Sequence, residues 1–362
     1  MKIKNRAVRL CSVLLLTLTL TAAIPLSACK SNKLYDYDLS EYISVPEYKN
    51  ITLSEETVRE LAEIQIYEYV WENKLMDDVT DGVIKKYDKA VVDYTSSFSV
   101  KEGETVTLPT KDVSVYIGKK AFVDGFEDAL IGMAIGETKE FKLIYPEPEK
   151  EDSIIPDEGG GVEDELAGKE ITYSVTLKSL QRPKPFTDDF CKEHTVYANE
   201  KEMMDSLTVD AIKTLVWQKI QSEATVIKYP EAEYDKYYAE LLSIDESAEQ
   251  LGMTRDAYIS AGKDIFEPFG ITPGISDSEL ASLSDEYARS TVKNDMILYF
   301  LARELNVPDS GSEYRKVKKA ILKENGYKNE KEFDEFVGDN RLHHNVLSVL
   351  VLNALYEQVT LV

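Results

Sequence analysis

Few residues of this sequence are histidines or cysteines, the types on which zinc sites and catalytic triads most often depend. The 362 residues include three histidines, His194, His343 and His344, and contain no His-Glu-x-x-His or Cys-x-x-Cys spacing. A zinc site needs several nitrogen or sulfur ligands, and a catalytic triad needs a histidine beside its nucleophile. No glycine-rich phosphate-binding motif is present either. We therefore expect no metal ion, no cofactor and no nucleotide-dependent reaction.

The N-terminal residues have the pattern of a bacterial export signal. Residues 1–10 carry four cations and no acid, and an apolar stretch follows at residues 11–26. The ending Leu-Ser-Ala-Cys at Cys29 resembles the lipobox, in which the cysteine is acylated and the chain is cut just before it. The alternative, an uncleaved membrane helix, fits less well because the apolar stretch is short and contains Pro25. We expect a signal peptide at residues 1–28, lipidation of Cys29, and a protein anchored at the extracytoplasmic face of the bacterial cell membrane.

The remaining composition agrees with this location. With Cys11 removed and Cys29 acylated, Cys191 has no partner for an internal disulfide, and we expect it to be a packing residue. The chain holds 66 acidic against 42 basic residues, a formal net charge of −24. A chain of this charge repels polyanions, so we expect neither a nucleic-acid partner nor binding to an anionic lipid surface through a basic patch.

Two segments precede the first predicted strand. Residues 29–50 are polar and rich in tyrosine without a sustained period, which predicts a solvated tether. Residues 51–84 contain apolar side chains at three- and four-residue steps, which predicts an amphipathic helix. Its apolar face is expected to pack on the helical domain that follows later in the chain, with client binding as the alternative.

The rest of the chain divides into a β-rich part and an α-rich part. Residues 85–182 contain four β-branched and aromatic runs, separated by glycines or charged turns, with one short helical piece at residues 125–133. Residues 183–362 have helical periodicity, interrupted at Pro230 and Pro308. The predicted fold class is α+β: a small antiparallel sheet wrapped on a short helix, followed by an all-α domain.

Five segments of the β-rich part follow, in order, the core motifs of FKBP-type peptidyl-prolyl isomerases, and the sequence resembles that family. The segments are residues 91–95, 116–127, 130–137, 145–147 and 166–177. The Leu-Ala-Gly-Lys sequence at residues 166–169 and the helical part at residues 183–362 resemble the trigger factor family of chaperones. The resemblance implies an FKBP-like isomerase domain followed by a helical chaperone domain like the trigger factor C-terminal domain.

The resemblance also implies where a substrate would bind. The family's pocket positions correspond to Tyr94, Phe122, Val123, Phe126 and Tyr173, with Val113 as a further substrate-binding residue. Phe126 takes the position of the aromatic floor, and the backbone N–H of Val123 would bind the substrate carbonyl. The alternative is that these side chains simply fill the core of the sheet, and it competes most closely at Tyr94 and Tyr173.

The sequence departs from these families in four respects. Val106 or Thr107 stands where the family has an aromatic-acidic pair, and Val113 replaces an aromatic residue. Residues 147–165, with nine acids and one lysine, replace the flap that usually carries a tyrosine over the substrate. No basic ribosome-docking signature precedes residue 85, so we expect no ribosome partner.

Two functions follow from the resemblance. One is a lipid-anchored peptidyl-prolyl cis-trans isomerase and folding chaperone, whose partners are unfolded or newly exported polypeptides with X-Pro bonds. The other is a holdase chaperone whose FKBP-like domain binds clients with little or no isomerase activity. Both predict the same fold, and the departures at the pocket leave the choice open.

Overall fold

The computed structural model describes residues 35–101, 104–146, 166–337 and 341–362. The contacts divide these residues into two compact units. The sheet unit comprises residues 59–208, and the helical unit comprises residues 35–58 together with residues 209–362. The helical unit is therefore discontinuous in sequence, with the sheet unit inserted into it. Cys29 and the acidic segment 147–165 lie outside the described residues.

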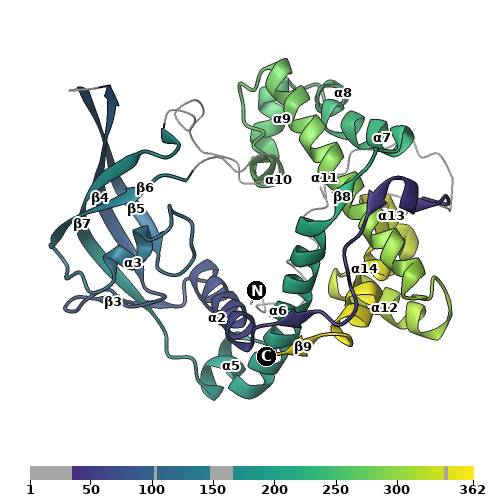
Figure 1. Cartoon of the computed structure of the whole chain (residues 1–362), viewed down its shortest axis with the longest axis horizontal. Helices are drawn as coiled ribbons and strands as arrows, with labels where there is room; N and C mark the ends of the chain where they lie inside the picture. The colour runs from purple at the N-terminus through teal and green to yellow at the C-terminus, as the bar shows by residue number, and fades with distance from the viewer. Residues whose placement is uncertain (1–34, 102–103, 147–165, 338–340) are drawn as a thin grey trace. The chain divides into compact units, whose positions relative to one another are not determined.

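The sheet unit is built on a five-stranded antiparallel sheet (Figure 1). Its strand order is β3-β7-β4-β5, and β6 also pairs with β7. The strands are β3 (Met76–Val79), β4 (Lys89–Lys101), β5 (Glu104–Tyr116), β6 (Thr138–Ile144) and β7 (Glu170–Pro183). The predicted small antiparallel sheet is confirmed, and it begins at β3, before the expected domain boundary at residue 85.

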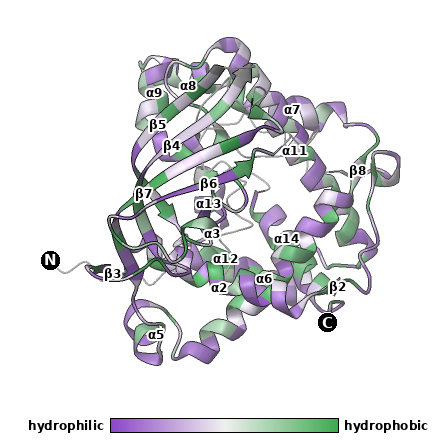
Figure 2. Ribbon diagram, turned by 60° about the vertical axis from the view of Figure 1, so that its left-hand side comes forward, coloured by the Kyte–Doolittle hydropathy of each residue, from purple (hydrophilic) through white to green (hydrophobic). Residues whose placement is uncertain are grey.

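The core of the sheet unit lies between one face of the sheet and the short helix α3 (Phe126–Leu130). Burial alternates along the first part of β7, as expected for a strand with one buried face, and hydrophobic and hydrophilic residues are interspersed along the sheet (Figure 2). Val92, Val115, Val175 and Leu177 are fully buried. Burial of each such side chain stabilises the fold by roughly 1.5–3 kcal/mol, so the strands and α3 form one packed body.

Helix α2 (Glu55–Glu72) packs its C-terminal half within the sheet unit. The Trp71 Nε1–H donates to the carbonyl of Tyr87 at 3.0 Å, and the indole lies 5.1 Å from the Tyr116 ring. Tyr67 stacks on Tyr87 with ring centroids 3.7 Å apart. The expected packing on residues 183–362 is met by Tyr69, whose hydroxyl donates to the carbonyl of His194, but it is wrong for Tyr67 and Trp71. A periodic pattern identifies an apolar face but not its partner.

Residues 35–53, which we call the N-terminal strap, pack on the helical unit. Tyr35, Leu39 and Ile43 are buried. The strap contains a 3₁₀ turn (Leu39–Glu41) and strand β1 (Ile43–Ser44), which pairs with β8 (Thr225–Val226), and strand β2 (Thr52–Leu53), which pairs with β9 (Thr360–Leu361). The predicted solvated tether is thus wrong for residues 35–50, because three apolar side chains four residues apart bury against the helices.

Helices form the rest of the chain. They are α5 (Asp188–His194), α6 (Glu200–Glu223), α7 (Glu231–Leu242), α8 (Ile244–Gln250), α9 (Arg255–Ala261), α10 (Lys263–Phe266), the 3₁₀ turn Glu267–Phe269, α11 (Asp277–Glu304), α12 (Gly311–Glu324), α13 (Glu330–Val337) and α14 (Arg341–Tyr356). Helix α11 is the centre of the helical unit, since Val292, Met296, Ile297 and Leu301 are fully buried. Within the described ranges, no helix is long and apolar enough to cross a membrane.

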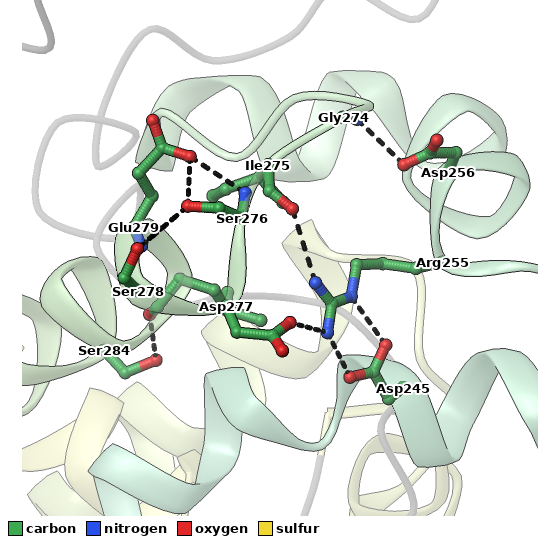
Figure 3. Close-up of polar contacts among 11 residues, drawn as sticks. Asp245, Arg255, Asp256, Gly274, Ile275, Ser276, Asp277, Ser278, Glu279 and Ser284 are labelled. Atoms are coloured by element: carbon green, nitrogen blue, oxygen red, sulfur yellow. Dashed lines mark hydrogen bonds and ion pairs between the residues drawn. The ribbon is translucent and has the colours of Figure 1, made fainter.

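Polar contacts fix the start of α11 (Figure 3). Ser276 and Glu279 form a reciprocal capping box, in which each side chain accepts from the backbone N–H of the other residue. The Arg255 guanidinium joins α8 to α11 by contacting Asp245 at 2.7 Å and Asp277 at 2.7 Å. The central helix therefore begins at a defined residue and is tied to its neighbours.

Candidate functional site

The residues predicted to line a pocket come together where the chain enters α3. Gly125 caps this helix in the left-handed conformation, with φ of +87°, and the Phe126 N–H donates to the carbonyl of Val123 at 2.9 Å. A Cβ at Gly125 would lie 3.1 Å from the Leu143 side chain. Glycine is therefore required at this turn by both conformation and space, and the turn places Phe122, Val123 and Phe126 at one end of the sheet core.

Phe126 is the centre of an aromatic cluster. The Phe122 ring stacks on it with centroids 4.7 Å apart and an interplanar angle of 14°. Tyr94, Phe141 and Tyr173 meet it edge to face at 5.7, 5.5 and 5.1 Å. The aromatic cluster, which we define as these five residues, thus contains four of the predicted pocket side chains.

The other two predicted residues take different places. Val113 is partly buried, packs against the same core and pairs with Val92 across β4 and β5. Val123 is partly exposed, and no partner for its backbone N–H is found among the described residues. That N–H is available as a donor beside the aromatic cluster, as the family resemblance implies.

Three residues of the site were missed in the reading of the sequence. Phe141 belongs to the aromatic cluster, and Leu143 and Tyr145 pack against the same core. They alternate along β6 and its end, so a strict period of two would have placed them on one face. Either Val106 or Thr107 stands where the family has an aromatic-acidic pair. Val106 also packs against this core, whereas Thr107 is exposed.

Glu127 holds the loop that leads to the aromatic cluster. Its carboxylate is 7% exposed and accepts the backbone N–H groups of Gly118, Lys120 and Ala121 at 2.7, 3.0 and 2.8 Å. Hydrogen bonds to a carboxylate are about twice as strong as neutral ones. The conformation of the segment that presents Phe122 and Val123 is therefore set by one buried acid.

The aromatic cluster contains no acid, base or thiol nucleophile. Burial, with smaller contributions from Tyr94 and Tyr145, raises the pKa of Tyr173 to about 12, so this hydroxyl is neutral at pH 7. Cys191 is buried elsewhere, with its pKa raised by burial. The arrangement therefore suits a reaction in which binding alone changes the barrier.

The floor of the site is covered in this conformation. Phe126 is only 1% exposed, so a ligand reaches it only after a neighbour moves. Phe122 is partly exposed and lies outside any helix or strand, whereas Tyr94, Phe141 and Tyr173 belong to paired strands. Phe122 is thus the ring best placed to move.

Comparison with known proteins agrees with this geometry. Residues 81–178 match the family model of FKBP-type peptidyl-prolyl cis-trans isomerases. Trigger factor of Pelotomaculum thermopropionicum is 27% identical over 64% of this chain and 50% of its own length. Trigger factor of Clostridium botulinum is 25% identical over 87% of this chain and 72% of its own length. The chain spans about half the length of most of the curated relatives it matches.

A solved structure of a trigger factor chaperone, from work on promiscuous substrate recognition in folding and assembly, also matches. It is 12% identical, covers 87% of this chain and 73% of its own chain, and has a TM-score of 0.25. The matched residues of the isomerase model contain every predicted pocket residue from Tyr94 to Tyr173. Residues 81–178 are therefore similar to FKBP-type peptidyl-prolyl isomerases, and the chain as a whole is similar to trigger factors.

Proposed function

We propose that this protein is a membrane-anchored, extracytoplasmic peptidyl-prolyl cis-trans isomerase and folding chaperone for exported polypeptides. The observation that carries the isomerase proposal is the aromatic cluster around Phe126, placed beside the available N–H of Val123. An apolar site with one directed donor is what catalysis of amide rotation requires.

Rotation about an X-Pro bond needs no covalent step. The planar amide is stabilised by resonance, and the barrier to rotation is about 18–20 kcal/mol. A site that removes water from the amide carbonyl destabilises the planar form relative to the twisted one. In the proposed mechanism the proline ring packs on Phe126, and the Val123 N–H binds the carbonyl of the residue beside proline.

The helical unit would hold the client. The trigger factor relatives support unfolded polypeptides as partners. Large apolar side chains of the helical unit are exposed at Ile227, Leu251 and Val362.

A second function, a holdase with little isomerase activity, is favoured by one feature of the site. The floor residue Phe126 is 1% exposed because Phe122 stacks on it, and Val113 stands where the family has an aromatic side chain. If Phe122 seldom moves, the domain binds clients without accelerating rotation.

The test of the isomerase is cis-to-trans conversion of a short X-Pro peptide by the soluble form that starts after Cys29. The variant Phe126→Leu keeps an apolar core residue but removes the aromatic floor, and we expect a loss of at least tenfold in kcat/KM. The matched control is Phe98→Leu, a buried phenylalanine of the same core outside the aromatic cluster. Both variants should still suppress aggregation of an unfolded client.

The outcomes separate the two functions. Acceleration that is lost in Phe126→Leu and kept in Phe98→Leu supports the isomerase. A folded parent that suppresses aggregation without accelerating rotation supports the holdase. Equal activity in the parent and in Phe126→Leu would contradict the proposed site.

The membrane anchor rests on the lipobox-like sequence at Cys29. In the native host, we expect mass spectrometry of the membrane fraction to find a chain that begins at acylated Cys29. Cys29→Ser should release the protein from membranes, and retention of that variant would contradict lipidation at this residue.

A further inference from the structure

Helix α12 carries a cluster of cations that the net charge of the chain conceals. Arg315, Lys316, Lys319 and Lys323 are all exposed. Among the described residues, none of them has a carboxylate within ion-pair distance, whereas the neighbouring Lys318 is paired with Glu330 at 2.5 Å. Four unpaired cations on one helix stand out in a chain with 66 acids and 42 bases.

The spacing of these cations places them on one face. Arg315, Lys319 and Lys323 follow one another at four-residue steps and therefore form a line along the helix. Each residue of an α-helix is rotated by about 100° from the one before it, which places Lys316 beside this line. We call these four residues the basic face of α12. Glu313 and Glu324 fall on the adjoining side of the helix by the same arithmetic, so the charge is concentrated rather than mixed.

The opposite side of α12 fixes the helix to the helical unit. Ile321 is buried in a small core with Phe333, Leu342 and Val346. The Tyr314 hydroxyl is hydrogen-bonded to His343 Nδ1 of α14 at 2.8 Å. The basic face is therefore exposed to solvent, and its orientation relative to the rest of the helical unit is fixed by the packing of α12.

The N-terminal strap is fixed close to the same helices. The Tyr35 hydroxyl donates to Asp295 of α11 at 3.2 Å, and its ring lies 5.1 Å from that of Tyr299. The Tyr299 ring in turn lies 6.3 Å from the ring of His344. His344 follows His343, the α14 residue that is hydrogen-bonded to Tyr314 of α12. The strap thus packs on α11 and α12 packs on α14, and α11 and α14 contact each other.

The strap sets how far this part of the protein can lie from an anchor. Six peptide steps separate Cys29 from Tyr35, and an extended chain covers at most about 3.6 Å per residue. If Cys29 is acylated, Tyr35 lies within roughly 20 Å of the lipid surface. A solvated tether of residues 29–50 would have allowed a far greater distance.

We propose that the basic face of α12 docks on the anionic headgroups of the membrane that holds acylated Cys29. This inference rests on the membrane anchor of the proposed function and adds an orientation to it. Cations within a Debye length of an anionic surface are attracted to it, and the anchor supplies the high local concentration that four cations alone lack. An acidic polypeptide is the competing partner, and it has no such advantage.

The experiment couples the soluble form, begun at Cys29, to maleimide lipids through the Cys29 thiol. Cys191 is fully buried and should not compete. Lysine acylation by a soluble reagent is then mapped by mass spectrometry on two kinds of vesicle, pure phosphatidylcholine and phosphatidylcholine with a minority of phosphatidylglycerol. Because the anchor is chemical, the result does not depend on natural lipidation or on isomerase activity.

We expect several-fold protection of Lys316 on the anionic vesicles, abolished at high salt, with no protection of Lys85. The triple variant Arg315→Gln, Lys319→Gln, Lys323→Gln should lose protection of Lys316. The matched variant Lys85→Gln, Lys111→Gln, Lys119→Gln changes the net charge equally and should keep it. Equal labelling of Lys316 on both vesicles, or protection by soluble polyglutamate but not by anionic vesicles, would overturn the proposal.

Discussion

The ring of Phe122 lies on the ring of Phe126, with centroids 4.7 Å apart and planes 14° from parallel. The other three members of the aromatic cluster meet Phe126 at steep angles of 68–81°. Phe122 is therefore the one member that covers a face of the floor ring rather than its edge. The stacked pair links access to the site with the position of a single side chain.

We expect Phe122→Ala to increase both the association rate and the dissociation rate of a prolyl peptide. The association rate rises because no ring has to move, and the dissociation rate rises because the wall of the site is lost. Stopped-flow measurement of peptide binding checks both rates. Phe98→Leu, which trims a buried side chain of the same core outside the aromatic cluster, is the control. An unchanged association rate in Phe122→Ala would show that Phe122 is not the cover.

Glu127→Ala should reduce both stability and activity, because three backbone N–H groups lose a charged acceptor. We expect a loss of about 3 kcal/mol in the free energy of unfolding of the sheet unit. Glu127→Gln retains one acceptor oxygen and should lose less. Urea unfolding of both variants checks the order, and a neutral effect of Glu127→Ala would mean that the loop does not depend on this carboxylate.

A separate prediction concerns the ion pair between Arg182 and Asp88. Asp88 is fully buried, and Arg182 binds it through two nitrogens at 2.9 and 2.7 Å. Arg182→Ala leaves the carboxylate buried without a cation, at a cost of about 3 kcal/mol. Thermal unfolding should show a lowered Tm for Arg182→Ala and a smaller loss for Arg182→Lys. Equal Tm values for parent and Arg182→Ala would contradict the structural role of the pair.

The stability of the helical unit should fall as the pH drops below about 6.5. Burial lowers the pKa of His344, against the opposing effect of Asp295, and Arg341, His343 and Lys236 lower it further. The unfolded state therefore takes up the proton at a higher pH than the folded state, so stability present above the unfolded pKa is lost as the pH falls.

Denaturant unfolding between pH 5 and pH 7.5 tests this dependence, with pH values chosen around the unfolded pKa of about 6.5. His344→Gln should flatten the profile relative to the parent. His343→Gln provides a comparison, because burial lowers the pKa of His343 as well. Parallel profiles for the parent and His344→Gln would rule out His344 as a source of the dependence.

Tyr35→Phe should destabilise the helical unit by about 1 kcal/mol, because the bond to Asp295 is lost while the ring still packs on Tyr299. Tyr237 also donates to Asp295, at 2.7 Å, so Tyr237→Phe is the matched variant. A soluble form that begins after the strap should lose much more. Urea midpoints of the three proteins give the comparison, and full stability without the strap would mean that its burial contributes nothing.

The sequence predicted the parts of the fold that local periodicity determines. The four strand runs and the start of α7 after Pro230 lie where they were expected. The start of α6 is likewise a local feature, since the Glu202 N–H donates to the Asn199 side chain at 2.9 Å. These features depend on neighbouring residues, which is why they are readable from spacing alone.

The strap and the partner of α2 were not predicted, because both depend on contacts between distant residues. Tyr35, Leu39 and Ile43 carry a four-residue spacing within a polar, irregular segment, and only the helices they meet explain their burial. Motif resemblance predicted four members of the aromatic cluster, Tyr94, Phe122, Phe126 and Tyr173. The fifth, Phe141, was not predicted, because the pairing of β6 with β7 places it beside Tyr173. The stacking of Phe122 on Phe126 is a conformational property that residue types do not specify.

The pairing of β2 with β9 has a consequence for the order in which the chain folds. The sheet unit is complete once residue 208 is available, whereas Thr52 and Leu53 find their partners only at Thr360 and Leu361. Because an exported chain emerges with its N-terminus first, there is an interval in which the whole sheet unit has emerged and the helical unit is not yet complete. During that interval a finished isomerase-like domain stands beside the unfolded remainder of its own chain, whose own X-Pro bonds are among the first it meets.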